Sequence, residues 1–344
     1  MTLALQYRRL VLRRTVLFAA LVLALIVSLL LDLAAGPANL DLAHIIAGLW
    51  QPESMELRYR IILFDVRLPD ALIALAVGAA LGLAGIETQT VLNNPLASPF
   101  TLGVSSFAAL GASIAIVFAP SFPWLDDTFL LPLCALSFAL ASGLVVLFFS
   151  QAMGGSRENV VLFGIALFFL GEALTAAMQY IGSAEAVQDI VFWNIGNLTK
   201  AGWPEVAIVT TCFLVILPFS LRHVWVLTLL RAGEAHAGSL GLNLNRVRFW
   251  VILRVSILAA FAVCFVGVIG FVGLIGPHVA RLLLGEDHRL LVPGSALCAA
   301  LILSLASVLS KTLLPGVIIP VGILTALIGV PLFILLIINQ KRTH

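Results

Sequence analysis

Long apolar runs separated by short polar stretches make up most of this chain. A helix needs about 20 apolar residues to cross the roughly 30 Å hydrocarbon core of a bilayer. Ten segments approach this pattern: 15–35, 68–88, 101–119, 129–150, 160–181, 205–221, 249–270, 274–284, 290–309 and 320–339. The eighth is too short to span alone and is expected to be a partial or kinked helix. The pattern predicts an all-α, polytopic membrane protein of about ten transmembrane helices, forming one domain over residues 1–344.

Composition supports this class and excludes others. Hydrophobic residues make up 61% of the 344 residues and charged residues only 10%, against about a quarter charged in soluble domains. The net charge of +2 comes without a basic cluster, so no nucleic-acid partner is predicted. The four cysteines lie in apolar runs without metal-ligand spacing, so no metal or cofactor is predicted.

An ATPase site is also excluded within this chain. A Walker A motif needs a Gly-Lys pair to wrap phosphates, and glycine precedes none of Lys200, Lys311 and Lys341. No catalytic constellation is visible either. The chain is therefore expected not to be an enzyme, and any ATP that drives it must be hydrolysed by another chain.

Basic residues indicate how the chain is oriented, because they gather on the cytoplasmic side of membranes. With a cytoplasmic N-terminus, five basic residues lie outside: Arg58, Arg60, Arg67, Lys200 and Lys311. Thirteen lie inside: Arg8, Arg9, Arg13, Arg14, Arg157, Arg222, Arg231, Arg246, Arg248, Arg281, Arg289, Lys341 and Arg342. Both termini are then cytoplasmic. Residues 36–66 form a periplasmic loop with a short amphipathic helix, and 188–203 form a short re-entrant or periplasmic helix.

One polar segment on the cytoplasmic side interrupts the apolar pattern. Residues 229–249, "LLRAGEAHAGSLGLNLNRVRF", place leucine and alanine at helical intervals, while Gly238 and Gly241 would stop a long helix. The residues leave three interpretations open: a membrane-surface anchor, a connecting loop, or a docking site for a soluble partner. An anchor needs a continuous apolar face, which the glycines interrupt.

Glu172 is a carboxylate near the middle of the segment 160–181. An ionised carboxylate facing lipid at that depth costs roughly 3 kcal/mol. We therefore expect Glu172 to face protein or a water-filled path. It would either line that path or hydrogen-bond a neighbouring helix.

Several ordered motifs carry a family resemblance. They are "RLPDALIALAVGAALGLAGIETQTVLNNPLASPFTLGVSS" (67–106), "GEAHAGSLGLN" (233–243), "GFVGLIGPHVARLLLGEDHRLLVPGSAL" (270–297) and "PVGILTALIGVPLFILLI" (320–337). Over nearly the whole length after the first span, the chain resembles the FecCD-type permeases of ABC importers, which carry ferric siderophores, haem or cobalamin. The resemblance implies the type II ABC importer architecture in a bacterial inner membrane.

The same resemblance implies partners and site residues. The permease pairs with a second, identical or homologous permease subunit; two cytoplasmic ATPase subunits bind beneath it and a periplasmic substrate-binding protein docks above. The segment 229–249 then resembles a pair of coupling helices, with Arg231, Glu234, Ala237, Leu240 and Gly241 as coupling residues. Arg67 and Lys311 are expected at the outer rim for docking. The translocation path and its gate are assigned to Asn94, Gly154, Gly155, Ser156, Glu172, Trp193 and Asn194.

Two departures from the family pattern and two alternatives accompany this interpretation. Asp70 stands where many members carry a second arginine, and Ile318 stands where an acidic residue is frequent. A secondary, ion-coupled transporter would need paired intramembrane carboxylates or a broken-helix ion site. A zinc or manganese ABC permease would place His and Asp in the path. Which chelate is carried, and whether the two permeases are identical, stays open at this stage.

Overall fold

A computed structural model describes residues 3–36, 40–119 and 127–340 of the chain. Two of the expected cytoplasmic basic residues, Lys341 and Arg342, and residues 37–39 of the predicted periplasmic loop lie outside the described residues. The described part is helical, with no strand. Its longer helices are α1 (Leu3–Ala34), α4 (Leu68–Val91), α5 (Val104–Phe118), α6 (Asp127–Ala152), α7 (Arg157–Ile181), α9 (Trp203–Arg222), α12 (Leu244–Val266), α13 (Val272–Leu284), α14 (His288–Thr312) and α15 (Val321–Gln340).

All ten apolar segments expected from the sequence are helices in the structure. In the described residues, seven helical stretches are long and apolar enough to cross a membrane, and three shorter apolar stretches are α5, α13 and the part Val321–Leu335 of α15. The short eighth segment is α13, with 13 residues. Helix α12 ends at Val266, four residues before the predicted end, because Gly267 adopts a positive φ of 75°. The chain is therefore a multi-pass helical membrane protein.

Helix α4 forms the centre of the bundle. It contacts α9, α12, α13 and α14, and nearly all of its residues are buried. Small residues allow this close packing: a Cβ at Gly78 would overlap the backbone of Ala300 on α14, and a Cβ at Gly85 would overlap the backbone of Gly273 on α13. The glycines of α4 therefore serve internal packing, because they let α13 and α14 approach its backbone closely.

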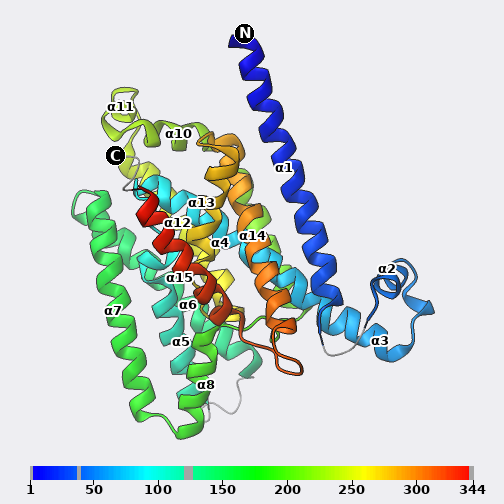
Figure 1. The fold of residues 1–344 in the computed structure, drawn as a ribbon. Helices are drawn as coiled ribbons and strands as arrows, with labels where there is room; N and C mark the ends of the chain where they lie inside the picture. Colours follow the sequence, from blue (N-terminus) through cyan, green and yellow to red (C-terminus); the bar gives the residue numbers. More distant parts are fainter. Residues whose placement is uncertain (1–2, 37–39, 120–126, 341–344) are drawn as a thin grey trace.

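The two ends of the bundle differ in what they carry. Helices α10 (Val224–Ala232) and α11 (Glu234–Ser239) lie at the end of the bundle where α1 begins and α15 ends, and we call this the coupling end (Figure 1). Helices α2 (Leu42–Trp50), α3 (Leu57–Ile61) and α8 (Ala184–Ile195) lie toward the opposite end, which we call the outer end after its expected orientation. Short helical turns η1 (Pro52–Ser54), η2 (Ile62–Arg67) and η3 (Pro99–Leu102) complete the connections.

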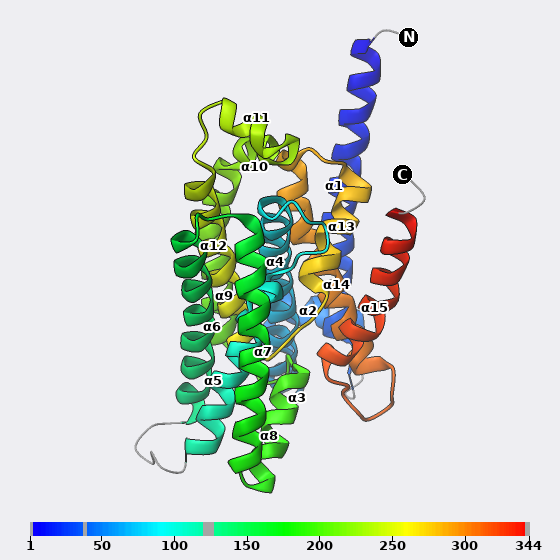
Figure 2. The same cartoon turned by 90° about the vertical axis from the view of Figure 1, so that its left-hand side faces the viewer.

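Helices α7 and α15 stand at the periphery of the bundle, and α8 contacts both of them (Figure 2). Much of the surface of each is exposed in the single chain. The predicted short helix in 188–203 is present as α8, which begins earlier than expected because Ser183 caps it by accepting a hydrogen bond from the Ala186 amide. The amphipathic helix predicted in 36–66 is α2, which buries Ile45 against Leu33 of α1 and Leu63.

Candidate functional site

The polar segment at the coupling end is a helix–turn–helix, as the residue pattern predicts. Its first helix, α10, begins at Val224, five residues before the expected start at 229. Gly233 separates α10 from α11 with a φ of 125°, and Gly241 ends the second helix with a φ of 83°. Because side-chain-bearing residues rarely adopt positive φ, the two glycines set the angle between α10, α11 and α12.

The five predicted coupling residues do not all face outward. Leu240 is 58% exposed, and Arg231 and Gly241 are also exposed. Ala237 is fully buried, so it packs α11 onto the bundle and does not reach a partner's surface. Glu234 is partly buried.

Glu234 is held in a charge cluster beneath α11, with 33% of its side chain exposed. It forms an ion pair with Arg248 of α12, and Arg157 at the start of α7 lies 4.0 Å from the same carboxylate oxygen. The Arg248 guanidinium also donates a 2.7 Å hydrogen bond to the Gly155 carbonyl. Arg248 thereby joins α11, α12 and the loop before α7.

A second cluster ties α10 to the core of the bundle. The Arg231 guanidinium donates to the Asn93 side-chain oxygen at 3.2 Å and lies 3.5 Å from the Glu286 carboxylate. Glu286 also pairs with Arg281 of α13 at 3.3 Å. Arg281 in turn donates to the Gln89 side-chain oxygen at 3.2 Å. Helix α10 is thus linked to the end of α4, the end of α13 and the α13–α14 turn.

His288 makes a third link at the same end. The ring is only 1% exposed, with Nε2 at 3.2 Å from the Thr90 hydroxyl of α4 and Nδ1 at 3.3 Å from the Thr228 hydroxyl of α10. The first residue of α14 therefore lies between α4 and α10.

A buried ion pair lies deeper, between α4 and α12. The Arg254 guanidinium makes two contacts with the Glu87 carboxylate, Nη2 to Oε1 at 2.9 Å and Nε to Oε2 at 3.3 Å. The Glu87 side chain is fully buried, and that of Arg254 is 9% exposed. Since α12 directly follows the α11 turn, this pair joins the coupling segment to the central helix.

The predicted gate loop is a tight turn connected to these clusters. Gly154 and Gly155 both have positive φ, and Ser156 caps α7 by accepting a hydrogen bond from the Asn159 amide. At the coupling end of α4, Asn94 also builds a turn, because its side-chain oxygen accepts from the Leu96 amide at 3.0 Å. The geometry explains these residues as turn formers, and their gating role stays a prediction.

The other predicted path residues lie on α7 and α8. Trp193 is 7% exposed, and the side-chain oxygen of Asn194 is buried without a hydrogen-bond partner. Glu172 lies on the exposed face of α7, away from the bundle core. Its side chain is exposed among the residues that the structure describes.

Arg67 and Lys311, which are expected at the outer rim for docking, have buried side chains in the single chain. Arg67 is 5% exposed and donates to the Leu33 carbonyl at 2.8 Å. The Lys311 side chain is 6% exposed and lies 2.9 Å from Asp32 and 4.0 Å from Asp70. A buried charge needs a nearby counter-charge or hydrogen-bond partner. For Arg67 this partner is a backbone carbonyl, and for Lys311 it is a pair of carboxylates, all within the same chain. Asp70, unusual in the family pattern, thus has a partner within the chain.

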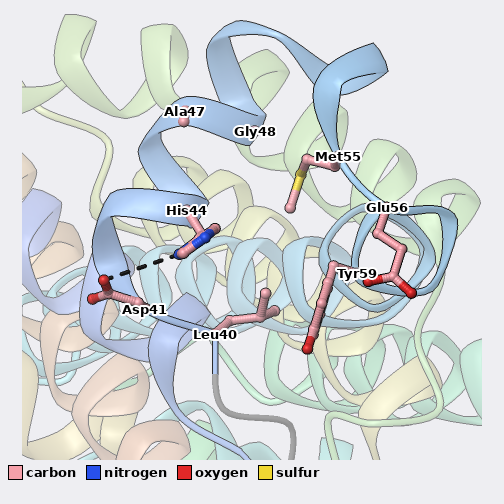
Figure 3. A pocket seen from close by; sticks show the side chains of 8 residues that line it. All are labelled: Leu40, Asp41, His44, Ala47, Gly48, Met55, Glu56 and Tyr59. Carbon is pink, nitrogen blue, oxygen red and sulfur yellow. Dashed lines mark ion pairs between the residues drawn. The ribbon is translucent and has the colours of Figure 1, made fainter.

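A shallow pocket of about 360 Å³ opens at the outer end, between α2 and α3 (Figure 3). His44 and Asp41 form a 4.0 Å ion pair at its rim, with Met55 and Tyr59 on the opposite wall. Among the described residues, no group of three or more His, Cys, Asp and Glu side chains could hold a metal ion.

The fold is that of a multi-pass helical membrane protein with a polar helix–turn–helix at one end of the bundle. Residues 24–339 match the FecCD transport family, and the chain belongs to that family. It is 35% identical over 323 residues to the hemin transport system permease protein HmuU of Yersinia pestis, covering 94% of this chain and 96% of the relative. It is 36% identical to the Fe(3+) dicitrate transport system permease protein FecD of Escherichia coli, covering 81% and 86%.

A solved structure supports the same assignment. The fold matches an ABC transporter described as of metal-chelate type, in an inward-facing conformation, with a TM-score of 0.82 and 32% identity. The match covers 94% of this chain and 98% of the solved one. The expected family and helical architecture are therefore confirmed.

Several residues of the clusters were missed from sequence alone. Glu87 is a carboxylate within an apolar helix, the same signal that selected Glu172, and it could have been found. Asp32 near the end of α1 carries that signal too. His288 gave no such signal, because only the fold brings it between Thr90 and Thr228.

Proposed function

We propose that this chain is the permease subunit of an ATP-driven importer of ferric siderophores or similar iron chelates, haem or cobalamin. It pairs with a second permease subunit in a bacterial inner membrane, with both termini in the cytoplasm. Two ATPase subunits bind at the coupling end, and a periplasmic binding protein delivers the solute at the outer end. Family membership and the names of the relatives support the substrate class.

The observation that carries this proposal is the construction of the coupling end. His236 of α11 and Leu240 just after it are exposed, while α10 is bound through Thr228 to α14 and through Arg231 to the turn after α4. A rigid-body movement of bound ATPase subunits would therefore be passed to the core of the bundle. A surface anchor or a plain loop would not need these connections.

Glu172 supports pairing with a second permease subunit. The carboxylate lies on the exposed face of α7, and exposure to lipid would cost roughly 3 kcal/mol. This face of α7 is therefore covered by another chain or by a water-filled path between two chains. We assign Trp193 and Asn194 to the same path, because α8 joins the outer end of α7 to α15.

The loop 151–159 serves as the cytoplasmic gate in this proposal. Arg248 connects the Gly155 carbonyl to Glu234 of α11. A shift of α11 would thus reach Gly154, Gly155 and Ser156 directly. Asn94 lies at the same end, in the loop that follows α4.

Docking of a binding protein is assigned to other basic residues than the sequence predicts. Arg67 and Lys311 are buried among internal partners, whereas Arg58, Arg60 and Lys200 are exposed in outer segments. Rim charges of this kind chiefly set encounter rate and orientation, and salt screens them. These three side chains are proposed to meet acidic residues of the binding protein.

Reconstitution tests the function. The chain is placed in vesicles with its ATPase and binding protein, and ferric siderophores, haem, cobalamin, zinc and manganese are screened for stimulated ATP hydrolysis and uptake. Stimulation by one iron chelate, abolished when the binding protein is omitted, is the expected result. Uptake driven by an ion gradient without ATP would favour a secondary transporter, and stimulation by free zinc or manganese alone would favour a metal-ion permease.

A further inference from the structure

An apolar groove runs along the outside of the bundle between α1, α9 and α14, with α4 as its floor. Its volume is about 570 Å³, and of its sixteen lining residues only Thr210 has a polar side chain. The walls include Phe18 of α1, Leu217 of α9 and Pro293 of α14. The floor is formed in part by Ala76 and Ala79, whose small side chains leave the space open.

The dimensions and lining of the groove fit a hydrocarbon chain. Along α9 the lining runs from Val206 to Leu217, which is about 16 Å at the helical rise of about 1.5 Å per residue. That is roughly half of the ~30 Å hydrocarbon core, the depth of one leaflet. A water molecule needs two to four polar partners, and this lining offers one hydroxyl.

The end of the groove nearest α10 is basic. Arg14 lies one helical turn before Phe18 on α1, and Arg289 lies one turn before Pro293 on α14. The Arg14 guanidinium rests against Gly285, in the turn that leads into α14. The Arg289 guanidinium lies 4.1 Å from the centre of the Trp225 ring, a cation–π contact at the start of α10.

Both arginines retain capacity for an anion. In the part of the chain that the structure describes, no carboxylate forms a salt bridge with Arg14 or Arg289. Trp225 is 62% exposed and has the amphipathic ring that is enriched at membrane interfaces. Guanidinium groups bind phosphate oxygens through charge-assisted hydrogen bonds.

We propose that this groove binds an anionic phospholipid from the leaflet on the α10 side. One acyl chain lies on Ala76 and Ala79 between α1, α9 and α14, and the phosphate is bound by Arg14 and Arg289 beside Trp225. The lipid fastens the peripheral helix α1 to α14 at the coupling end. The site is separate from the solute path and needs no identified solute.

The test measures which lipids stay with the purified full-length chain. The wild-type protein and variants are incorporated into nanodiscs of equal parts phosphatidylcholine and phosphatidylglycerol, extracted into mild detergent, and analysed by native mass spectrometry. The wild-type chain is expected to retain phosphatidylglycerol in preference to phosphatidylcholine. Arg14→Gln combined with Arg289→Gln should lower this retention roughly tenfold or more, as expected from losing the charge-assisted hydrogen bonds of two guanidinium groups to one phosphate.

Two further variants separate the head-group site from the groove and from general charge. Arg8→Gln combined with Arg13→Gln removes the same charge from exposed positions of α1 and should leave retention unchanged. Ala79→Phe fills the groove and should reduce retention of both lipids, with Ala79→Leu as a milder variant if assembly suffers. Three results would each overturn the proposal. The Arg8/Arg13 control could lose as much phosphatidylglycerol as the Arg14/Arg289 variant. Both Ala79 variants could retain lipid fully, or a second protein chain could be found in place of lipid.

Discussion

Breaking the buried pair between Glu87 and Arg254 should destabilise the chain more than any surface charge change. Glu87→Gln removes the negative charge but preserves size, so Arg254 keeps its positive charge at 9% exposure without a counter-charge. Removing one partner of a buried pair costs about 3–5 kcal/mol. Arg254→Met should cost a similar amount, because it leaves the fully buried Glu87 carboxylate unpaired.

The double variant gives the decisive comparison. Replacing a buried ion pair by apolar residues of similar volume is often close to neutral, so Glu87→Leu with Arg254→Met should cost much less than the two single changes added together. A surface pair provides the control: Arg157 and Glu158 are 38% and 70% exposed, and Glu158→Gln should cost less than about 1 kcal/mol.

Unfolding of the purified chain in mixed micelles of mild detergent and sodium dodecyl sulfate would measure these differences. Tryptophan fluorescence is a convenient signal, since the chain has six tryptophans. Two results would show that Glu87 and Arg254 do not stabilise one another. One is a double variant whose loss of unfolding free energy equals the sum of the two single losses. The other is a loss for Glu87→Gln no larger than that for Glu158→Gln.

Three further predictions concern transport by the reconstituted complex. The Gly241→Trp variant should assemble, but its ATP hydrolysis should no longer drive uptake. A side chain at a φ of 83° costs about 1–2 kcal/mol and would change the turn after α11. Full uptake would contradict this prediction. His288→Leu should lower the uptake per ATP hydrolysed. Little stability should be lost, since the Thr90 and Thr228 hydroxyls still donate to carbonyls of their own helices. An unchanged ratio of uptake to ATP hydrolysis would mean that His288 only packs the helices together. Glu172→Gln should change uptake or substrate preference without loss of protein, whereas normal transport in both Glu172→Gln and Glu172→Leu would remove Glu172 from the path.

The fold was predictable from the sequence because the bilayer imposes a strong length and polarity rule. Each apolar segment from 15–35 to 320–339 is helical in the structure, and the family motifs indicated the architecture that these helices form. Helix ends were less predictable. Helix α12 ends where Gly267 adopts a positive φ. A Cβ at Gly267 would overlap the carbonyl of Trp193. Because Trp193 lies more than seventy residues earlier, the local pattern could not predict this end.

The candidate site was predictable in position but not in its connections. The pattern of 229–249 located the helix–turn–helix, yet Glu234 gave no hint of Arg248 as its partner. The positions of Arg67 and Lys311 at span ends suggested docking residues, but gave no sign that both side chains have partners within the chain. Asp32 lies at the end of α1, far from both in sequence, and only the packing of α1 against α14 brings its carboxylate to Lys311.

The contacts of α4 indicate how a movement at the coupling end would divide the bundle. On its last two turns and the residues just after, Glu87 pairs with α12, Gln89 with α13, Thr90 with α14 and Asn93 with α10. These five helices are joined by side-chain contacts and would move as one body. Helix α7 is reached instead through the cluster formed by Arg157, Glu234, Arg248 and the Gly155 carbonyl. A shift of α11 would therefore act on this body and on the loop before α7 together, because Arg248 of α12 contacts both Glu234 of α11 and the Gly155 carbonyl of that loop.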